Sequence, residues 1–218
     1  MLFRSGLRRL VVPADEVALA ISVQQPEAFV QMRNLPPLDT AALVLAGGHG
    51  RRAGGPKALK LRDGQLLWRW QCERLVQLGA RPLAVLHPSA WQPGQVRADP
   101  DAPLFASLLA GLAAVPPGDV WVLPVDCPCP PRAVWVALLA AARECEARGR
   151  SWLAIQPELD GRGGHPVLIS AAWRAELMSL SPTSARLDHV LAAAPQRVRV
   201  PVEDPGVLAN FNFDGIAR

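Results

Sequence analysis

Apolar positions along the chain follow two alternating periods from Ala41 onward. Short, continuously apolar runs are typical of buried strands, and between them apolar residues recur every three or four positions, as on one face of a helix. The clearest helical stretch places Trp135, Leu138, Ala142 and Cys145 at i, i+3, i+7 and i+10. The pattern predicts strands at 41–46, 81–87, 120–125, 151–156, 165–170 and 196–202, and helices at 66–79, 103–115, 135–145, 171–180 and 185–193.

This alternation predicts an α/β fold in which a mostly parallel sheet lies between two layers of helices. Ligands of such folds bind at the carboxyl ends of the strands, so we expect functional residues directly after strands. The helix at 66–79 is expected to bury Trp68, Cys72, Leu75 and Val76 on one face.

The first 38 residues differ from the rest of the chain. They show no regular alternation and end in a Pro-Pro linker. We therefore predict an N-terminal extension of unassigned role over residues 1–38 and one domain over residues 39–218, a length that a single hydrophobic core can serve.

The composition indicates which kinds of ligand and which cellular compartment to expect. The net charge is +4, but the basic residues are dispersed among acidic ones, which favours small anionic ligands over nucleic acid. No apolar run approaches the roughly twenty residues that a bilayer-spanning helix needs. The cysteines lack the spacing of a zinc site or a disulfide framework: Cys72, Cys127, Cys129 and Cys145. These features predict a cytoplasmic protein with reduced thiols and no membrane partner.

The stretch LAGGHGRRAGGPKAL, residues 45–59, follows the first strand. It is not a P-loop, because Pro56 occupies the lysine position and Ala58 stands where a hydroxyl would bind magnesium. It is not a dinucleotide fingerprint either, because the residues at 54–56, Gly-Gly-Pro, would break the helix that this motif opens. What remains is a long loop whose backbone amides wrap a triphosphate, with Arg52 and Lys57 as side-chain cations.

The same loop resembles the L-A-G-G-x-x-x-R-x-G-G-x-K signature of the MobA-like family of nucleotidyltransferases, which includes molybdenum cofactor guanylyltransferases. Further similar segments follow in the family's order: RADPDAPLFASLLAGL, LPVDCP, GGHPVLIS and NFNFD. The resemblance covers about residues 41–214. It implies a Rossmann-like three-layer α/β/α sandwich of the nucleotide-diphospho-sugar transferase type, with one antiparallel strand in a mostly parallel sheet.

The implied reaction transfers a nucleoside monophosphate from a nucleoside triphosphate to the terminal phosphate of molybdenum cofactor and releases pyrophosphate. A phosphate monoester is already anionic at neutral pH, so no protein nucleophile is required. The site must instead neutralise and align two anions. We assign this task to the amides of residues 46–55, to the cations Arg52 and Lys57, and to a Mg²⁺ or Mn²⁺ ion held by Asp126 at the end of the strand 120–125.

The resemblance also implies roles for residues outside this centre. Asn212 is expected to be the second metal ligand, but Phe213 and Asp214 replace the family's Thr-Pro, so Asn210 and Asp214 stay open for that role. The acceptor is expected to contact Gly164 and His165. Asp99 is expected to read the base, so the full nucleotide set is Leu45, Ala46, Gly47, Gly48, Gly50, Gly55, Lys57 and Asp99.

Several functions stay open at this point. GTP is favoured because one carboxylate can accept from the adjacent ring and exocyclic donors of guanine. The alternatives are a CTP-dependent molybdopterin cytidylyltransferase, a sugar-1-phosphate nucleotidyltransferase, and a catalytically silent nucleotide-binding partner of a molybdoenzyme. The expected partners are the triphosphate and molybdenum cofactor or molybdopterin, with molybdoenzymes or their chaperones as protein partners.

Overall fold

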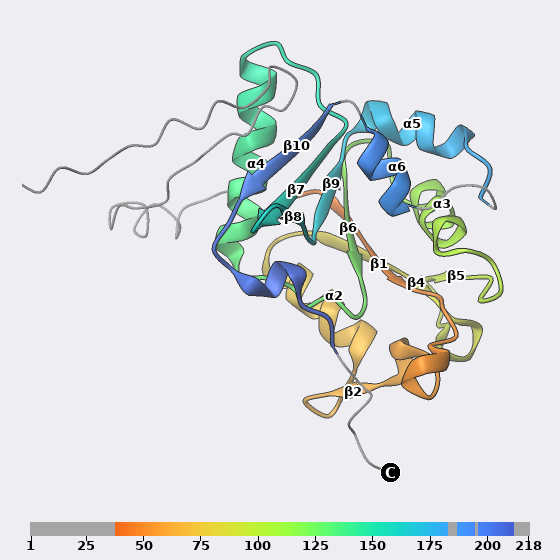
Figure 1. Cartoon of the computed structure of the whole chain (residues 1–218). Coiled ribbons are helices and arrows are strands. Elements are labelled where there is room, and N and C mark those ends of the chain that lie inside the picture. Colours follow the sequence, from red (N-terminus) through yellow and green to blue (C-terminus); the bar gives the residue numbers. More distant parts are fainter. Residues whose placement is uncertain (1–37, 183–186, 195, 212–218) are drawn as a thin grey trace, which may run out of the picture.

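Eight strands form one sheet within the part of the chain that the computed structural model describes, which is residues 38–182, 187–194 and 196–211. Figure 1 shows the order of the main strands across the sheet, which is β10 (Arg197–Pro201), β7 (Ala154–Leu159), β9 (Val167–Ile169), β6 (Val120–Pro124), β1 (Ala41–Ala46), β4 (Arg81–Leu86) and β5 (Val96–Arg97). The short strand β8 (Arg162–Gly163) pairs with β7. The predicted extension, Asn212 and Asp214 lie outside the described residues, apart from Leu38 at the end of the extension.

The strand directions confirm the predicted mostly parallel sheet with one antiparallel strand in its main path. Strand β1 is parallel to β4 and β6, and β10 is parallel to β7. Strand β9 runs antiparallel to both of its neighbours, β6 and β7. The two-residue strand β8 is a second antiparallel addition, at the end of β7. A separate hairpin is formed by β2 (Leu61–Arg62) and β3 (Gln65–Leu66).

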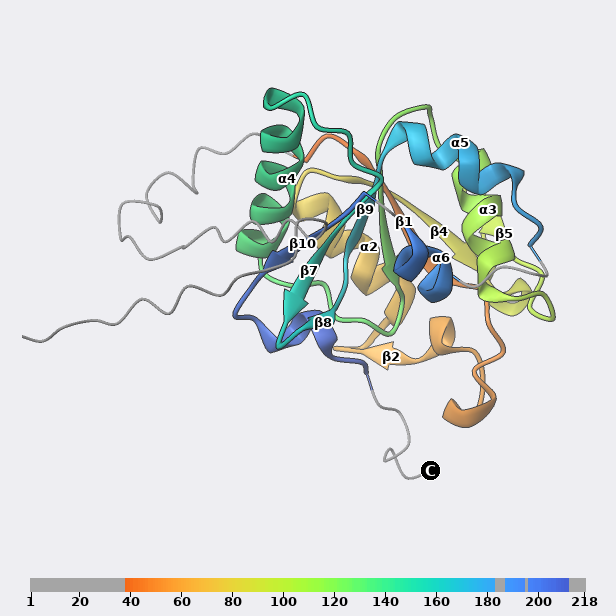
Figure 2. The same cartoon turned by 45° about the horizontal axis from the view of Figure 1, so that its top comes forward.

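Helices cover both faces of the sheet, so the predicted three-layer sandwich is confirmed. Figure 2 shows α2 (Leu67–Gln77) and α4 (Arg132–Ala147) on one face, and α3 (Leu104–Ala114), α5 (Ala171–Ser179) and α6 (Leu187–Ala193) on the other. The residues of β1 alternate between two cores: Ala42, Val44 and Ala46 face the α2 and α4 side, whereas Ala41, Leu43 and Leu45 face the α3 side. A strand buried on both faces reads as a continuous apolar run.

The helix prediction after residue 130 is confirmed. Trp135, Leu138, Ala142 and Cys145 are all buried, and the Trp135 ring packs edge to face against Trp121 of β6 at 5.0 Å between ring centroids. Such an aromatic contact adds to the apolar area that α4 buries against the sheet.

The prediction for the buried face of α2 is wrong in part. Val76 is 59% exposed, and the fully buried positions at i, i+4 and i+8 are Leu67, Gln71 and Leu75. The hydropathy pattern missed this face because its central residue, Gln71, is polar. The reason for burying a glutamine there is found in the functional site.

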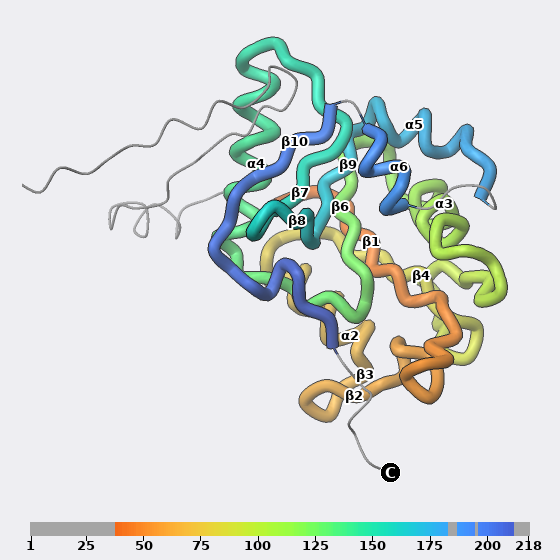
Figure 3. Tube along the Cα trace, viewed as in Figure 1, coloured from red at the N-terminus to blue at the C-terminus, as the bar shows by residue number. Residues whose placement is uncertain are grey.

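The carboxyl ends of β1, β4 and β6 meet at one edge of the sheet, and antiparallel β9 begins at the same edge. In the chain trace of Figure 3 the segments that follow these strands gather there, including the long loop after β1. Short 3-10 helices shape these segments: η2 (Arg51–Ala53), η3 (Lys57–Leu59), η4 (Pro88–Ala90) and η5 (Pro205–Leu208). No helix among the described residues combines the length and the apolarity needed to cross a membrane.

Candidate active site

The glycine-rich loop after β1 closes on itself around Gly50. This residue has φ +60°, and a Cβ placed on it would lie 2.0 Å from the carbonyl oxygen of Gly55, so only glycine fits there. The Gly50 carbonyl accepts from the amides of Ala53 at 2.8 Å and Gly55 at 3.1 Å, and Gly54 donates to Arg51. Three of the loop amides are therefore engaged within the loop itself. These three belong to the amides of residues 46–55 that the sequence predicted to wrap a triphosphate.

Hydrogen bonds join the end of β1 to the segments that end β6 and follow β4. The amide of Val125, at the end of β6, donates to the Leu45 carbonyl at 2.9 Å, and the amide of His87, after β4, donates to the Ala46 carbonyl at 3.1 Å. Leu45 and Ala46 are both buried. Their side chains therefore belong to the core, and their backbone sets where the glycine-rich loop begins.

Gly47 lets a second loop approach the first. A Cβ on this residue would lie 2.4 Å from the Cβ of Ala98 and 2.8 Å from the hydroxyl of Ser107. Ala98 follows β5, so the missing side chain brings the loop that carries Asp99 against the glycine-rich loop. Gly48, by contrast, is exposed and has open space around it.

Lys57 and Asp126 form an ion pair at the centre of this edge. Lys57 belongs to η3 and Asp126 follows β6, and the Nζ to Oδ2 distance is 2.5 Å. The side chains are 34% and 23% exposed, so the pair is open to a ligand. Arg52 is exposed on η2 of the same loop. The two residues that the sequence assigned separately, to phosphate and to metal, thus lie in direct contact.

Gln71 holds the turn that carries Asp126. Its side chain is completely buried in α2, and its amide nitrogen donates to the carbonyls of Val125 at 3.1 Å and Cys127 at 2.5 Å. These two residues flank Asp126 on either side. Sequence reasoning missed this role, although a polar residue spaced four positions from both Leu67 and Leu75 was the available signal.

The C-terminal segment docks on the same turn. The amide of Phe211 donates to the Asp126 carbonyl at 2.6 Å, and the Cys127 thiol donates to Asn210 Oδ1 at 3.2 Å. Burial, together with the nearby charge of Asp126, raises the pKa of Cys127 to about 12, so the thiol keeps its proton. Asn210 therefore lies beside the proposed metal ligand. Asn212 and Asp214 lie outside the described residues.

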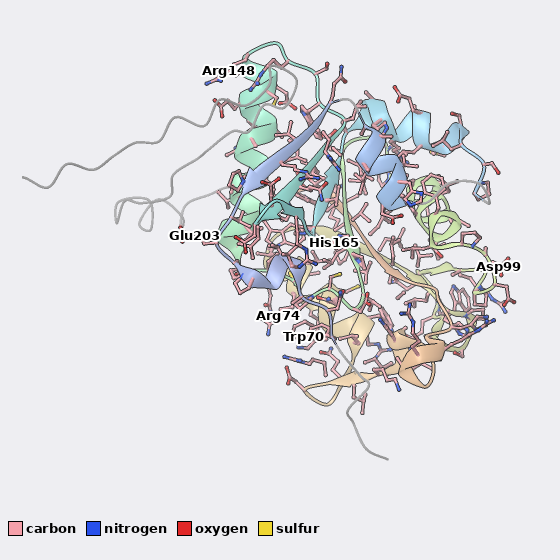
Figure 4. All side chains as sticks on the ribbon, viewed as in Figure 1. Trp70, Arg74, Asp99, Arg148, His165 and Glu203 are labelled. Carbon is pink, nitrogen blue, oxygen red and sulfur yellow. The ribbon has the colours of Figure 1, made fainter. Side chains whose placement is uncertain are left out.

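An aromatic and arginine stack covers this docked segment. The rings of Trp70 and Phe211 meet edge to face at 5.8 Å, and the Arg62 guanidinium lies 4.8 Å from the Phe211 centroid and 5.5 Å from that of Trp70. The Arg74 guanidinium lies 4.5 Å from the centroid of the Trp70 ring, and Figure 4 labels both residues on α2. Trp70 is half-buried, and its ring anchors Phe211.

His165 and Gly164 line a cavity of about 920 Å³ at the start of β9. Gly164 fits against η5, because a Cβ on it would lie 2.4 Å from the Val207 carbonyl, which accepts from the His165 amide at 2.8 Å. Burial lowers the pKa of His165 to about 4, and the charge of Asp126 opposes this shift. The imidazole is therefore neutral at neutral pH. Figure 4 shows His165 near the middle of the molecule.

The cavity has an apolar wall and a polar wall. The apolar side is formed by the start of α3 and by α6, including Leu104, Phe105, Leu187 and Leu191. The polar side includes Gln156 of β7 and Arg197 and Arg199 of β10. Arg199 is fixed by Glu158 at 3.0 Å. An apolar lining with a few polar groups is typical of small-molecule sites.

Asp99 lies apart from His165, toward the edge of the molecule, as the labels in Figure 4 show. Its side chain is exposed, and one carboxylate oxygen accepts from the amide of Asp101 at 3.0 Å. A carboxylate has further lone pairs, so this turn leaves acceptor capacity on Asp99.

The donor set around Asp126 fits magnesium or manganese bound together with substrate. Among the described residues there is no group of three or more His, Cys, Asp or Glu side chains placed to hold a metal. Magnesium characteristically takes one or two carboxylates and completes its shell with phosphate oxygens and water. A single strand-end aspartate is therefore a sufficient protein contribution beside a triphosphate.

Fold and site together define a nucleotidyltransferase. Residues 42–199 match the MobA-like NTP transferase domain, so the chain belongs to this family. The molybdenum cofactor guanylyltransferase of Ralstonia nicotianae is 29% identical over 191 residues, which cover 82% of this chain and 94% of the relative.

Solved structures share the fold. The molybdopterin-guanine dinucleotide biosynthesis protein A of Archaeoglobus fulgidus superimposes with a TM-score of 0.56 at 21% identity, covering 75% of this chain and 84% of that one. Rv0371C from Mycobacterium tuberculosis H37Rv, in complex with manganese, gives a TM-score of 0.55 at 19% identity, covering 76% and 89%.

Proposed function

We propose that this protein transfers the guanylyl group of GTP to the terminal phosphate of molybdenum cofactor and releases pyrophosphate. The observation that carries the proposal is the Lys57 and Asp126 pair at 2.5 Å, which lies where the glycine-rich loop meets the end of β6. The similarity to a molybdenum cofactor guanylyltransferase supports the choice of acceptor. We take residues 39–218 as the catalytic domain, place the enzyme in the cytoplasm, and regard molybdoenzymes or their chaperones as recipients of the product.

The reaction needs charge neutralisation more than acid or base catalysis. An oxygen of the acceptor phosphate forms a bond to the α-phosphorus of GTP, the bond from that phosphorus to the bridging oxygen breaks, and pyrophosphate leaves with the electron pair. The acceptor is already anionic near neutral pH. The amides of the glycine-rich loop that are not bonded within the loop, together with the side chains of Arg52 and Lys57, would hold the triphosphate and stabilise charge on its oxygens.

Asp126 would hold the divalent ion, Mg²⁺ or Mn²⁺, with Asn212, Asn210 or Asp214 as a second ligand from the C-terminal segment. Such an ion neutralises phosphate charge and orients the phosphates. Lys57 links the metal ligand to the phosphate-binding loop, because its ammonium contacts Asp126 and its backbone belongs to that loop. Gln71 keeps the Asp126 turn in place on both sides.

The acceptor would bind in the cavity lined by Gly164 and His165. Its volume of about 920 Å³ is in the range of small-molecule sites. Asp99 would accept from the ring N–H and the exocyclic amine of guanine. Cytosine presents an amine beside an acceptor nitrogen, which a carboxylate repels, so CTP is the less favoured donor.

The test supplies molybdenum cofactor or molybdopterin, magnesium and each of GTP, CTP, ATP and UTP, and assays pyrophosphate and the dinucleotide product. We expect a preference for GTP that Asp99→Asn weakens more than it weakens turnover. Asp160→Asn, a change at another exposed loop aspartate, is the matched control.

Other outcomes identify the alternatives. A CTP preference that Asp99→Asn leaves unchanged would make the protein a cytidylyltransferase. Product formed with a sugar 1-phosphate alone would replace the acceptor, and binding without pyrophosphate would make the protein a silent nucleotide-binding partner.

A further inference from the structure

Two histidines and an aspartate join three loops at the carboxyl edge of the sheet. His49 belongs to the glycine-rich loop, His87 follows β4, and Asp101 lies between β5 and α3. His49 Nε2 is 2.8 Å from Asp101 Oδ1, and His49 Nδ1 is 3.4 Å from His87 Nε2. The two imidazole rings meet edge to face at 5.3 Å.

The backbone of Ser89 fixes the direction of these hydrogen bonds. Its amide donates to His87 Nδ1 at 3.2 Å, and its hydroxyl, which can also donate, lies 2.8 Å from the same atom. A backbone N–H only donates, so Nδ1 carries no proton and neutral His87 carries its proton on Nε2. That proton is donated to His49 Nδ1, which leaves the proton of neutral His49 on Nε2, directed at Asp101. One tautomer of each histidine therefore satisfies all three hydrogen bonds, from Ser89 to His87, from His87 to His49 and from His49 to Asp101.

Protonation disrupts this arrangement. A proton added to His49 Nδ1 would face the N–H of His87. A proton added to His87 Nδ1 would displace the hydrogen bond from the Ser89 amide and would leave only the Ser89 hydroxyl, 2.8 Å away, as its acceptor. The pKa of His87 is lowered, first by burial and then by His49, while Asp101 raises it. The pKa of Asp101 is lowered chiefly by its hydrogen bond to His49, and Arg51 acts in the same direction. Asp101, Arg51, His49 and His87 are thus the ionisable groups whose charges act on this series of hydrogen bonds.

The contact links the two halves of the nucleotide site. Asp101 is bonded to Asp99 through its amide, and Ala98 of the same loop packs where Gly47 has no side chain. The loop that carries Asp99 is therefore held against the glycine-rich loop at two points, Gly47 to Ala98 and His49 to Asp101.

We propose that His49 is a positioning residue that, bridging neutral His87 and Asp101, holds the base-reading loop against the phosphate-binding loop. The role rests on the proposed function, because it assumes that these loops bind one nucleotide. Asp101 is 78% exposed and His49 35% exposed. Exposed ion pairs contribute at most modest interaction energy. We therefore expect loss of the contact to raise the KM for GTP by about 5-fold, with kcat changed by less than about 2-fold.

The test compares His49→Ala with His49→Gln in the full-length protein. A glutamine oxygen can accept from His87 while its amide donates to Asp101, so His49→Gln should keep the wild-type KM, whereas His49→Ala should raise it. His189→Ala, at a histidine that is 74% exposed, is the control and should match the wild type.

A second readout does not depend on turnover. The chain has four histidines, so ¹⁵N-edited spectra can resolve each imidazole. We expect neutral His49 and His87 with the proton on Nε2, and Asp101→Ala should change the His49 signals most.

A proton on Nδ1 of either neutral residue would overturn the proposal, as would a wild-type KM in His49→Ala. If the wild type turns over no substrate, the proposed function fails, while the spectra still decide whether the contact exists.

Discussion

Replacing Gln71 with leucine tests how the turn that carries Asp126 is held. The substitution keeps the size of a buried side chain and removes the two hydrogen bonds to Val125 and Cys127, at 3.1 and 2.5 Å. A buried carbonyl that loses its donor costs about 1–3 kcal/mol. The leucine recovers about 1–2 kcal/mol of apolar burial. Because two carbonyls lose their donor, the cost is about 2–6 kcal/mol, and after the recovered burial the free energy of unfolding should fall by about 2–3 kcal/mol at the middle of these ranges.

The same change should impair catalysis beyond its effect on folding. Freed carbonyls let the turn shift, and a displacement of about 1 Å at a reacting centre can cost about 100-fold in rate. Urea denaturation gives the stability, and kcat with GTP, magnesium and acceptor gives the activity, both at a temperature where the variant is folded.

Gln77→Leu is the matched control, because it makes the same substitution at an exposed position of the same helix. It should change the stability by less than about 0.5 kcal/mol. If Gln71→Leu matched this control in both stability and kcat, the assignment of Gln71 as the support of Asp126 would be refuted.

Three further substitutions probe the rest of the site. Lys57→Ala should lower kcat/KM by about 100-fold or more, since a preorganised cation worth roughly 3 kcal/mol is lost, and near-normal turnover would remove Lys57 from the site. Phe211→Ala should weaken Mn²⁺ binding, measured by calorimetry with GTP present, because the stack with Trp70 and Arg62 no longer fixes the C-terminal segment; Phe211→Trp should preserve it. His165 has a folded pKa of about 4, below the usual 6.5, so its burial costs stability as pH falls from about 6.5 to about 4. His165→Gln should therefore reduce the acid-induced loss of stability, measured by urea denaturation, by about 3 kcal/mol, and an unchanged dependence of stability on pH would contradict the lowered pKa of His165.

Local patterns in the sequence were enough to predict the layers of the fold. The apolar run of β1 and the spacing of Trp135 to Cys145 report burial directly, because each depends on residues close in the chain. The two-residue strands β5 and β8 escaped prediction because so short a segment has no period to detect.

Contacts between distant segments explain what the sequence left undetermined in the site. The motif drew attention to Lys57 and Asp126 separately, but their ion pair joins residues 69 positions apart. Gln71 and Trp70 were read as parts of an ordinary amphipathic helix, and their roles depend on partners at 125–127 and 211. Which residue accompanies Asp126 at the metal stays a prediction, since Asn212 and Asp214 lie outside the described residues.

Tracing the α-phosphate of GTP tests the central claim most directly. GTP labelled at that phosphate would be incubated with magnesium, molybdenum cofactor and either the wild type or Asp126→Asn, and the label followed by chromatography. We predict one label in each dinucleotide formed, unlabelled pyrophosphate in equal amount, and binding of GTP without product by Asp126→Asn. Label remaining in GTP or GMP with the wild type, or full product formation by Asp126→Asn, would contradict guanylyl transfer at this site.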